Sequence, residues 1–378
     1  MPETHSRNNI RIVKTEVDPE FSEFEYVEPV SIKHRGRSAG FNPANRFDKT
    51  HTKPTFEDVV EQEIRVPTQY LADASKSILA KNDSPDIPFT YSINPYRGCE
   101  HGCIYCYARP SHEYLGYSSG LDFETRILVK HDAAALLEKE FRNPRWVPEA
   151  ICLSGNTDCY QPVERKLEIT RSLLKVFLRY RNPVRIITKN HLVTRDLDLL
   201  SELARLNLVG ALISITTLDP ELAHRMEPRT SLPKKRLQTI EAMAKAGVPV
   251  GVMTAPVIPG LNDHEIPEIL RMASEAGATS AGYTVVRLTH SLKELFKDWL
   301  AREYPARSEK VIHSIEDTRH GGLNNTEFFK RHTGEGTMSD HISETFALFS
   351  KKYGLNKEVV RKKPAAFLRD GVEQMRLF

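Results

Sequence analysis

The stretch NPYRGCEHGCIYCYAR, residues 94–109, contains three of the chain's five cysteines. Cys99, Cys103 and Cys106 follow a C-x3-C-x2-C spacing directly after FTYSIN (89–94), a β-branched and aromatic run that predicts a strand. Thiolates are the usual ligands of iron–sulfur clusters. Three ligands on one loop can hold three irons of a four-iron cluster, and the fourth iron then keeps an open position, as catalytic metals generally do. The spacing therefore predicts a cluster-binding loop after a strand.

Zinc is the alternative metal for these thiols, with His101 or His112 as the fourth ligand. Zinc sites usually combine two separated pairs of ligands, and the sequence shows no second pair. An odd number of cysteines, three of them within eight residues, also makes a disulfide framework a poor explanation. The spacing favours an iron–sulfur cluster over both.

Five further apolar or β-branched runs follow the first strand and alternate with segments of helical periodicity. In one such segment Ile169, Leu173, Val176 and Phe177 fall on one helical face. Six strands alternating with helices indicate βαβ units and a parallel sheet. A doubly wound sheet and an incomplete barrel both fit this α/β pattern. The five runs are AICLS (150–154), VRIIT (184–188), GALISIT (210–216), VPVGVMT (248–254) and AGYTVV (281–286).

The chain divides into three regions by pattern. Residues 1–65 are polar without sustained periodicity and predict an irregular N-terminal extension, in which the loop 34–48 could cover the mouth of a barrel. Residues 66–290 hold the alternating strands and helices, and 291–378 predict a helical C-terminal extension.

Composition indicates an ordinary soluble globular protein. The chain has 378 residues, 40% of them hydrophobic and 27% charged, with a formal net charge of +3. This charge is too close to balance to argue for nucleic acid or an anionic membrane as a partner. The acidic N-terminal region does not resemble a secretory signal, and no stretch approaches the roughly 20 apolar residues of a spanning helix. We expect a cytoplasmic protein with reduced thiols.

The C-x3-C-x2-C spacing, the aromatic Tyr105 before the last cysteine and the position after the first strand resemble the signature of the radical S-adenosylmethionine (SAM) superfamily. The likeness covers about residues 88–290 and is most similar to the spore photoproduct lyase-like branch, whose members are often labelled DNA repair photolyases and include proteins of unassigned substrate. It implies a partial (β/α)6 TIM-like barrel, with the cysteines at the C-terminal mouth. It also implies two cofactors, a [4Fe–4S] cluster and SAM.

The resemblance further implies that the cluster reductively cleaves SAM to a 5′-deoxyadenosyl radical, which abstracts hydrogen from a substrate. The expected partners are an unidentified substrate and a reductant such as flavodoxin or ferredoxin. Three functions stay open at this point. They are an enzyme with a substrate outside DNA repair, a spore photoproduct lyase-like enzyme acting on damaged DNA, and a non-enzymatic zinc or iron–sulfur binding module.

The resemblance also suggests residues that contact SAM. Gly155 and Asn156, after the second strand, would meet the methionyl amino group, and Lys189, after the third, would pair with the carboxylate. Ser214, inside an apolar strand where a hydroxyl needs a partner, would bind the ribose or carboxylate unless it bonds a backbone carbonyl. Arg225 would also meet the carboxylate, through its bidentate fork.

The segment PVIPGLND (256–263) resembles the superfamily's G-x-I-x-G-x-x-E adenine motif. Ile258 and Gly260 match it, whereas Pro256 replaces the first Gly and Asp263 the Glu. The resemblance therefore assigns Ile258 and Gly260 to SAM binding, although the motif matches only in part.

Two further features are candidates for substrate chemistry. Cys159 lies beyond the second strand and could donate a hydrogen atom to a product radical, as the cysteine of spore photoproduct lyase does, whereas Cys152 lies inside that strand and fits a core position. The basic run at 234–236 is typical of a solvated helix face and does not establish DNA binding.

Overall fold

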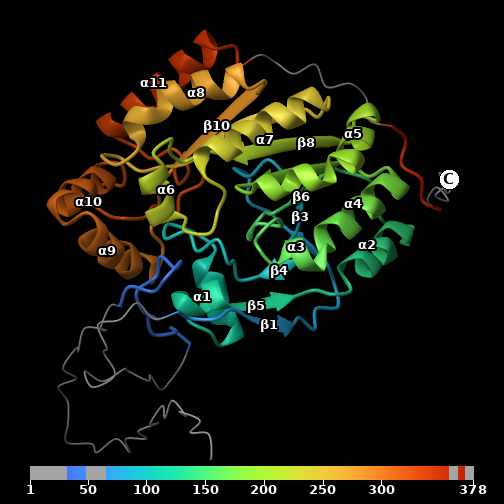
Figure 1. The fold of residues 1–378 in the computed structure, drawn as a ribbon, viewed down its shortest axis with the longest axis horizontal. Helices are drawn as coiled ribbons and strands as arrows, with labels where there is room; N and C mark the ends of the chain where they lie inside the picture. The colour runs from blue at the N-terminus through green and yellow to red at the C-terminus, as the bar shows by residue number, and fades with distance from the viewer. Residues whose placement is uncertain (1–31, 48–64, 357–364, 371–378) are drawn as a thin grey trace, which may run out of the picture.

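The computed structural model describes residues 32–47, 65–356 and 365–370, and its centre is a seven-stranded sheet (Figure 1). The strand order is β10-β9-β8-β7-β6-β3-β2. All neighbours are parallel except β2, which pairs antiparallel with β3 at the edge. The strands are β2 (Leu79–Lys81), β3 (Tyr91–Ile93), β6 (Ile151–Leu153), β7 (Val184–Thr188), β8 (Val209–Ser214), β9 (Val250–Val257) and β10 (Ser280–Val285).

The six parallel strands follow one another in space as they do in sequence. A doubly wound sheet reverses its strand order at a switch point, and this sheet does not. The order therefore selects the partial barrel from the two architectures that the sequence pattern allowed. The predicted (β/α)6 fold is confirmed, and each of the six expected runs overlaps its strand, with boundaries that differ by no more than three residues.

Helices connect the parallel strands and cover the sheet (Figure 1). The pairs α2–α4, α4–α5, α7–α8 and α8–α11 are in contact. In α4 the predicted apolar face is buried, including Leu173 and Phe177. Positive φ angles of 74° at Gly247 and 103° at Gly277 end α7 and α8 as expected for C-terminal glycines. The helices of this region are α2 (Ala133–Arg142), α3 (Glu164–Leu167), α4 (Ile169–Tyr180), α5 (Leu197–Arg205), α6 (Pro220–Met226), α7 (Pro233–Lys245) and α8 (Ile266–Glu275).

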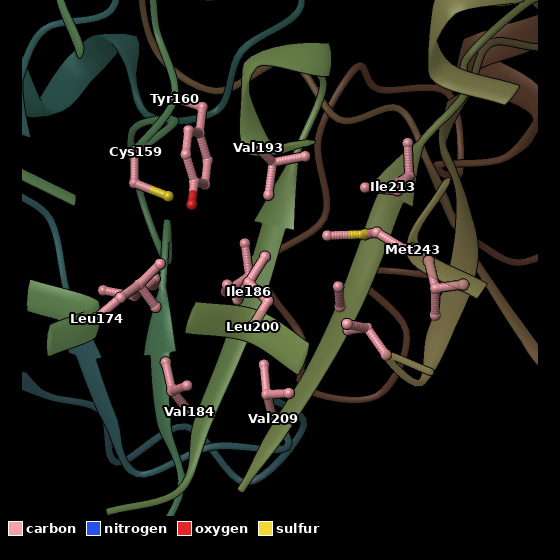
Figure 2. Packing of buried hydrophobic residues seen from close by; sticks show 14 of the residues in the cluster. Cys159, Tyr160, Leu174, Val184, Ile186, Val193, Leu200, Val209, Ile213 and Met243 are labelled. Carbon is pink, nitrogen blue, oxygen red and sulfur yellow. The ribbon is translucent and has the colours of Figure 1, made fainter. Parts of the chain in front are cut away.

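Two hydrophobic clusters hold the barrel and its additions together. The larger one joins the strands to the helices outside them, and Figure 2 shows part of it, with Val184, Ile186 and Leu200 among the labelled residues. The second cluster joins Ile104 of the cysteine loop to Ile258 after β9 and to Trp299 in the C-terminal region. Burial of these side chains is the main stabilising term for such a fold.

A small second sheet was not expected from the sequence. Its order is β1-β5-β4, with β1 (Gln69–Ala72), β4 (Tyr96–Arg97) and β5 (Arg126–Val129), and the helix α1 (Leu121–Thr125) precedes β5. Because β4 lies between β3 and the first cysteine, this sheet fixes the start of the cysteine loop.

Among the described residues, three α-helices follow the last strand: α9 (Leu292–Glu303), α10 (Ser308–Asp317) and α11 (Thr337–Lys352). Phe346 of α11 lies against Tyr283 of β10, with ring centroids 4.5 Å apart. The segment 327–332 reaches from the β10 edge toward the opposite edge of the sheet: the N–H of Val285 donates to His332 O (2.7 Å), and Arg331 pairs with Asp86 in the loop before β3.

Residues 34–47, the described part of the expected loop 34–48, are largely buried against the cysteine loop. The Ser38 hydroxyl donates to the Gly102 carbonyl, and the Arg37 guanidinium donates to Glu124 O at 2.7 Å. Arg302 of α9 donates to Ser38 O at 3.0 Å. This segment has no helix or strand but is packed on the core. Within the described ranges, no helix is both long enough and apolar enough to cross a membrane.

Candidate functional site

The cysteine loop leaves the C-terminal end of β3 and turns back through two glycines. The φ angles are 79° at Gly98 and 65° at Gly102, which favour glycine. A Cβ at Gly98 would lie 3.0 Å from the carbonyls of Phe123 and Arg126. A Cβ at Gly102 would lie 2.7 Å from the Glu124 carboxylate. Close backbone approach therefore requires glycine at both positions.

A fully buried arginine, Arg109, holds the loop from behind. Its guanidinium donates to the carbonyls of Cys103 (2.9 Å), Gly102 (3.1 Å), Ser119 (3.1 Å) and Gly120 (3.0 Å). It also pairs with the buried carboxylate of Glu124 at 2.5 Å. One cation thus organises four carbonyls and one carboxylate, and fixes the loop that carries the three cysteines.

The three cysteines of the loop are free thiols that suit a metal cluster. Cys99 and Cys103 are buried, and Cys106 is partly exposed. Burial raises the pKa of all three thiols. The charge of Lys189 acts against this for Cys103 and Cys106, so a cation lies close enough to favour their thiolates. Bound metal would supply the remaining drive for deprotonation.

Each cysteine of a four-iron cluster binds a different iron atom, so the loop needs only to present three thiolates around one cluster. Within the parts of the chain that the structure describes, no group of three or more His, Cys, Asp and Glu side chains lies close enough together to hold a single metal ion. The donor set of three thiols on one loop fits a cluster.

The two histidines of the zinc alternative have other neighbours. The ring of His101 has its Nδ1 3.4 Å from Asp158 and its Nε2 3.1 Å from the Asn190 amide. His112 lies against the ring of Phe123, with centroids 5.6 Å apart, and its burial lowers its pKa to about 4. Both ring nitrogens of His101 are thus engaged within the protein.

Lys189 lies beside the cysteine loop, at the end of β7. Its Nζ is 5.8 Å from the ring centroid of Tyr105, and its N–H donates to Asp158 at 2.8 Å. The third strand therefore ends at the same end of the barrel as the cysteines, as the architecture predicted. The role of Lys189 toward SAM stays a prediction.

The segment after β6 is tied to the cysteine loop by Tyr107. The Tyr107 hydroxyl donates to the Gly155 carbonyl at 2.5 Å. The N–H of Asn156 donates to the Asn94 side chain at 2.8 Å, and a Cβ at Gly155 would lie 2.7 Å from Ser92 Cβ. Gly155 and Asn156 thus lie next to the loop. Sequence reasoning missed Tyr107, although its place beside Cys106 was a signal.

Ser214 ends β8 with a buried side chain whose hydroxyl has no hydrogen-bond partner among the described residues. Its carbonyl, in contrast, accepts a hydrogen bond from Arg236 at 3.1 Å. The backbone-carbonyl alternative for its hydroxyl therefore does not apply within this part of the chain. The predicted contact of the Ser214 hydroxyl with SAM stays a prediction.

The two residues of the weakened adenine motif lie at different depths. Ile258 is fully buried in the same cluster as Cys103 and Tyr105, so it is near the loop. Gly260 has a φ of 77° and forms a turn whose carbonyl accepts a hydrogen bond from Arg307 at 2.8 Å. Its nearest side chains belong to α10. Ile258 is thus brought to the site, whereas Gly260 faces the C-terminal helices.

Arg225 is not brought to the cysteine loop. Its guanidinium donates to Glu303 O at 2.8 Å, pairs with Glu221 and lies 5.1 Å from the ring centroid of Tyr304. These contacts dock α6 on α9. The structure therefore gives Arg225 a packing role, and we do not retain it as a ligand of the SAM carboxylate.

Cys159 lies in the larger hydrophobic cluster with none of its surface exposed, and Figure 2 shows it beside Tyr160. Its N–H donates to the Ser154 hydroxyl (2.8 Å), and its carbonyl accepts from Thr170 (2.6 Å). Burial raises the pKa of its thiol well above the ordinary value. This placement favours packing, and a hydrogen-donor role stays an untested prediction. Cys152, in β6, is likewise buried.

Sequence reasoning also missed Asp158. Its carboxylate accepts hydrogen bonds from the Thr188 hydroxyl and the Lys189 N–H, each at 2.8 Å, and lies next to His101. It thereby joins the ends of β6 and β7 to the cysteine loop. A single Asp in a loop carries no recognisable signal, so only the fold reveals this function.

The comparison with protein families agrees with this geometry: residues 93–273 match the model of the radical SAM superfamily. Residues 93–273 therefore form a radical SAM domain. The cofactors of this superfamily are a [4Fe–4S] cluster and SAM. The matched range starts at the last residue of β3 and ends in α8, so it covers the cysteine loop and four of the six parallel strands in full.

Relatives of this chain occur in bacteria and archaea. An uncharacterized protein of Mycobacterium tuberculosis is 39% identical over 221 residues, which are 58% of this chain and 65% of the relative. An uncharacterized protein of Methanocaldococcus jannaschii is 27% identical over 221 residues, covering 58% of this chain and 79% of the relative. The match thus spans just under two thirds of the mycobacterial protein's own length.

Solved structures of spore photoproduct lyase share the fold. A variant with bound AdoMet and dinucleoside spore photoproduct has a TM-score of 0.51 and 17% identity, covering 75% of this chain and 78% of the lyase. A second variant has a TM-score of 0.52, also at 17% identity, and covers 76% and 80% of the two chains. At this identity the likeness establishes a common fold.

Proposed function

We propose that this chain is a radical SAM enzyme whose [4Fe–4S] cluster is held by Cys99, Cys103 and Cys106. The observation that carries the proposal is the placement of three free cysteines on one loop at the C-terminal mouth of a parallel barrel, with Lys189 beside them. When bound, the cofactors supply one-electron cleavage of the SAM sulfonium bond, which yields methionine and a radical able to take a hydrogen atom from a substrate.

The residues around the loop would bind and orient SAM. Lys189 supplies a cation for the methionyl carboxylate, and the Gly155–Asn156 backbone supplies polar groups for the amino group. The hydroxyl of Ser214, whose side chain is buried at the end of β8, would bind the ribose or carboxylate. Ile258 supplies an apolar wall near Tyr105. Gly260 would act indirectly, through the turn that it forms.

Exclusion of water would protect the chemistry, and residues 32–47 are placed for this. They cover the back of the cysteine loop through Ser38, whose backbone and hydroxyl bond Glu124 and Gly102. A dry site strengthens electrostatic interactions and limits side reactions of reactive intermediates.

The proposed enzyme needs an unidentified substrate and an electron donor, for which a flavodoxin or ferredoxin is the proposed class. We also propose a cytoplasmic location, because free thiols that bind a cluster need a reducing compartment. We do not propose repair of damaged DNA, since the likeness to spore photoproduct lyase concerns the fold alone and fold does not determine substrate.

Reconstitution tests this function. The full chain is loaded with iron and sulfide without oxygen, reduced in the presence of SAM, and assayed for 5′-deoxyadenosine. Deuterium-labelled candidate substrates are then added, and transfer of deuterium into 5′-deoxyadenosine identifies the substrate. A loaded and reduced protein that makes no 5′-deoxyadenosine would refute the proposal.

A further inference from the structure

A second site lies on the C-terminal face of the barrel, outside the residues assigned to the cofactors. It is a pocket of about 430 Å³. Its walls come from the segments after β6, β7 and β8, three consecutive strand ends. A barrel carries ligand sites at this face. The lining residues are Arg165, Asn190, His191, Leu192, Thr194, Arg195, Ser231 and Lys235.

The lining is strongly cationic for a chain of nearly balanced charge. It includes three permanent cations, Arg165, Arg195 and Lys235, and no carboxylate. Arg195 is compensated from outside the lining, since it pairs with Glu164 and Asp196, each at 2.8 Å. Arg165 and Lys235 form no ion pair with any described residue and are exposed. The pocket therefore has two cations available to a ligand.

Neutral polar groups complete the pocket and are held in place. The N–H of His191 donates to the Ser231 hydroxyl at 2.8 Å, and its Nδ1 lies 2.9 Å from the Thr239 hydroxyl. Lys235 lies in the first turn of α7, a helix of 13 residues that begins with a proline at its first position. The positive end of the helix dipole adds to the potential of Lys235.

The pocket adjoins the cysteine loop through one side chain. The Asn190 carbonyl oxygen accepts from the N–H of Leu192 at 3.0 Å and from the Ser231 hydroxyl at 3.3 Å. Its amide nitrogen lies 3.1 Å from Nε2 of His101, between Cys99 and Cys103. A ligand in the pocket thus binds one residue away from the cluster-binding loop.

We propose that this pocket binds a phosphate group, with Arg165 and Lys235 as its ligands. Two cations from different elements suit the spread charge of a phosphate better than that of a single carboxylate, and arginine offers a bidentate fork to its oxygens. The volume lies within the range of ligand pockets, which leaves room for the rest of a phosphorylated molecule. That the phosphate belongs to the substrate rests on the proposed function, whereas phosphate binding itself does not.

The test measures binding to the full chain by equilibrium dialysis, with three probes: inorganic phosphate, adenosine monophosphate and a short single-stranded oligonucleotide. The variant R165Q/K235Q removes the two available cations. Its matched control is K166Q/K234Q, which removes the same charge from the adjacent positions of α3 and α7, outside the pocket lining. We expect R165Q/K235Q to raise the dissociation constant of the bound probe about tenfold or more, because the variant loses the charge-assisted hydrogen bonds from both side chains to the phosphate. The control should change it by less than about threefold.

Preference for adenosine monophosphate indicates a phosphorylated small molecule, and preference for the oligonucleotide, with steep salt dependence, indicates a nucleic-acid backbone. Either preference supports the phosphate site if R165Q/K235Q loses binding of the preferred probe and K166Q/K234Q retains it. An equal loss in the control, or no binding of any probe by the wild-type chain, would overturn the proposal. Cleavage of SAM without substrate is measured on the same variants and on the wild type, and its rate should be the same in all of them. Absence of SAM cleavage in the wild type would contradict the proposed function and not the phosphate site.

Discussion

Lys189 places its ammonium group next to the ring of Tyr105, and its charge partly offsets the burial that raises the pKa of the neighbouring Cys103 thiol. A methionyl carboxylate at this end of the barrel would enter a confined site, where an uncompensated charge is costly. Removing one partner of a buried charge pair usually costs about 2–5 kcal/mol. We expect Lys189→Ala to weaken SAM binding by about 1.4 kcal/mol or more, which is a tenfold change, because chelation to iron retains part of the affinity.

SAM affinity of the reconstituted variant is the measurement, with iron counted on the same sample. Lys175→Ala, at an exposed position of α4, is the matched control and should bind SAM as the wild type does. Wild-type affinity of Lys189→Ala at full iron loading would show that Lys189 is only a lysine at the rim of the barrel.

The place of a single residue in the fold could be predicted where a strand end defined it, whereas its role could not. Ser214 ends β8 and Lys189 follows β7, and the carboxyl ends of parallel strands share one edge, so the positions of both followed from the pattern. Arg225 lacked such a constraint. Its partner Glu303 is 78 residues away in a helix whose docking the pattern did not specify. Tyr107 was missed for the same reason, since its partner is the Gly155 backbone.

At the scale of elements, the cysteine loop depends on the buried pair of Arg109 and Glu124. Glu124→Gln preserves the shape of the side chain but leaves the arginine charge uncompensated. Breaking one partner of a buried pair costs about 3–5 kcal/mol. We therefore expect the free energy of unfolding to fall by about 3 kcal/mol in denaturant titrations, and cluster loading to fall with it.

The control for Glu124→Gln is Glu241→Gln, which removes an exposed partner of Lys245 on α7. Exposed pairs contribute about 0–1 kcal/mol, so stability should hardly change. A loss at Glu124 no larger than at Glu241 would show that the pair does not organise the loop.

The segment 327–332 closes the open side of the sheet through Asp86. Hydrogen bonds from Arg331, at 2.5 and 2.7 Å, hold the pKa of Asp86 below its ordinary value, with a smaller contribution from the N–H of Phe329. A depressed folded-state pKa stabilises the contact at pH values above the unfolded pKa, which is about 3.9, and the stabilisation is lost as the pH falls through the lower folded value.

We therefore expect amide hydrogen exchange of 327–332, corrected for the intrinsic rate, to accelerate below about pH 4 in the wild type. In Asp86→Asn, exchange should already be fast at neutral pH and nearly independent of pH. The peptide 266–275 of α8 serves as an internal control. Equal protection of 327–332 in both proteins at neutral pH would mean that Asp86 does not hold this segment.

Strands inside apolar runs and helices with an apolar stripe were predictable, and the strands of the small sheet were not. The six parallel strands overlap the expected runs because burial on both faces of a parallel sheet leaves an apolar run in the sequence. The strands β1, β4 and β5 have two to four residues each, and β1 is largely exposed. Outside a longer apolar run, so short a segment shows no period, and its pairing depends on residues far away in sequence.

For the whole molecule, the sequential strand order selects a barrel, and the barrel brings three cysteines, Lys189 and Asp158 to one end. Net charge, by contrast, is an average that conceals local organisation. A chain of +3 holds a pocket with three cations and no carboxylate in its lining. The lack of a basic excess therefore did not exclude an anionic ligand, because the fold collects Arg165 and Lys235 from different elements.

The central claim is that the loop of Cys99, Cys103 and Cys106 holds the cluster on which SAM cleavage depends. The most direct test is the yield of 5′-deoxyadenosine from anaerobically reconstituted and reduced single variants, with iron and sulfide counted on each sample. Cys103→Ala should lose both the cluster and the product, as should the other two variants, whereas Cys152→Ala, in the buried strand β6, should retain both. Formation of 5′-deoxyadenosine by Cys103→Ala at the wild-type rate would contradict the assignment.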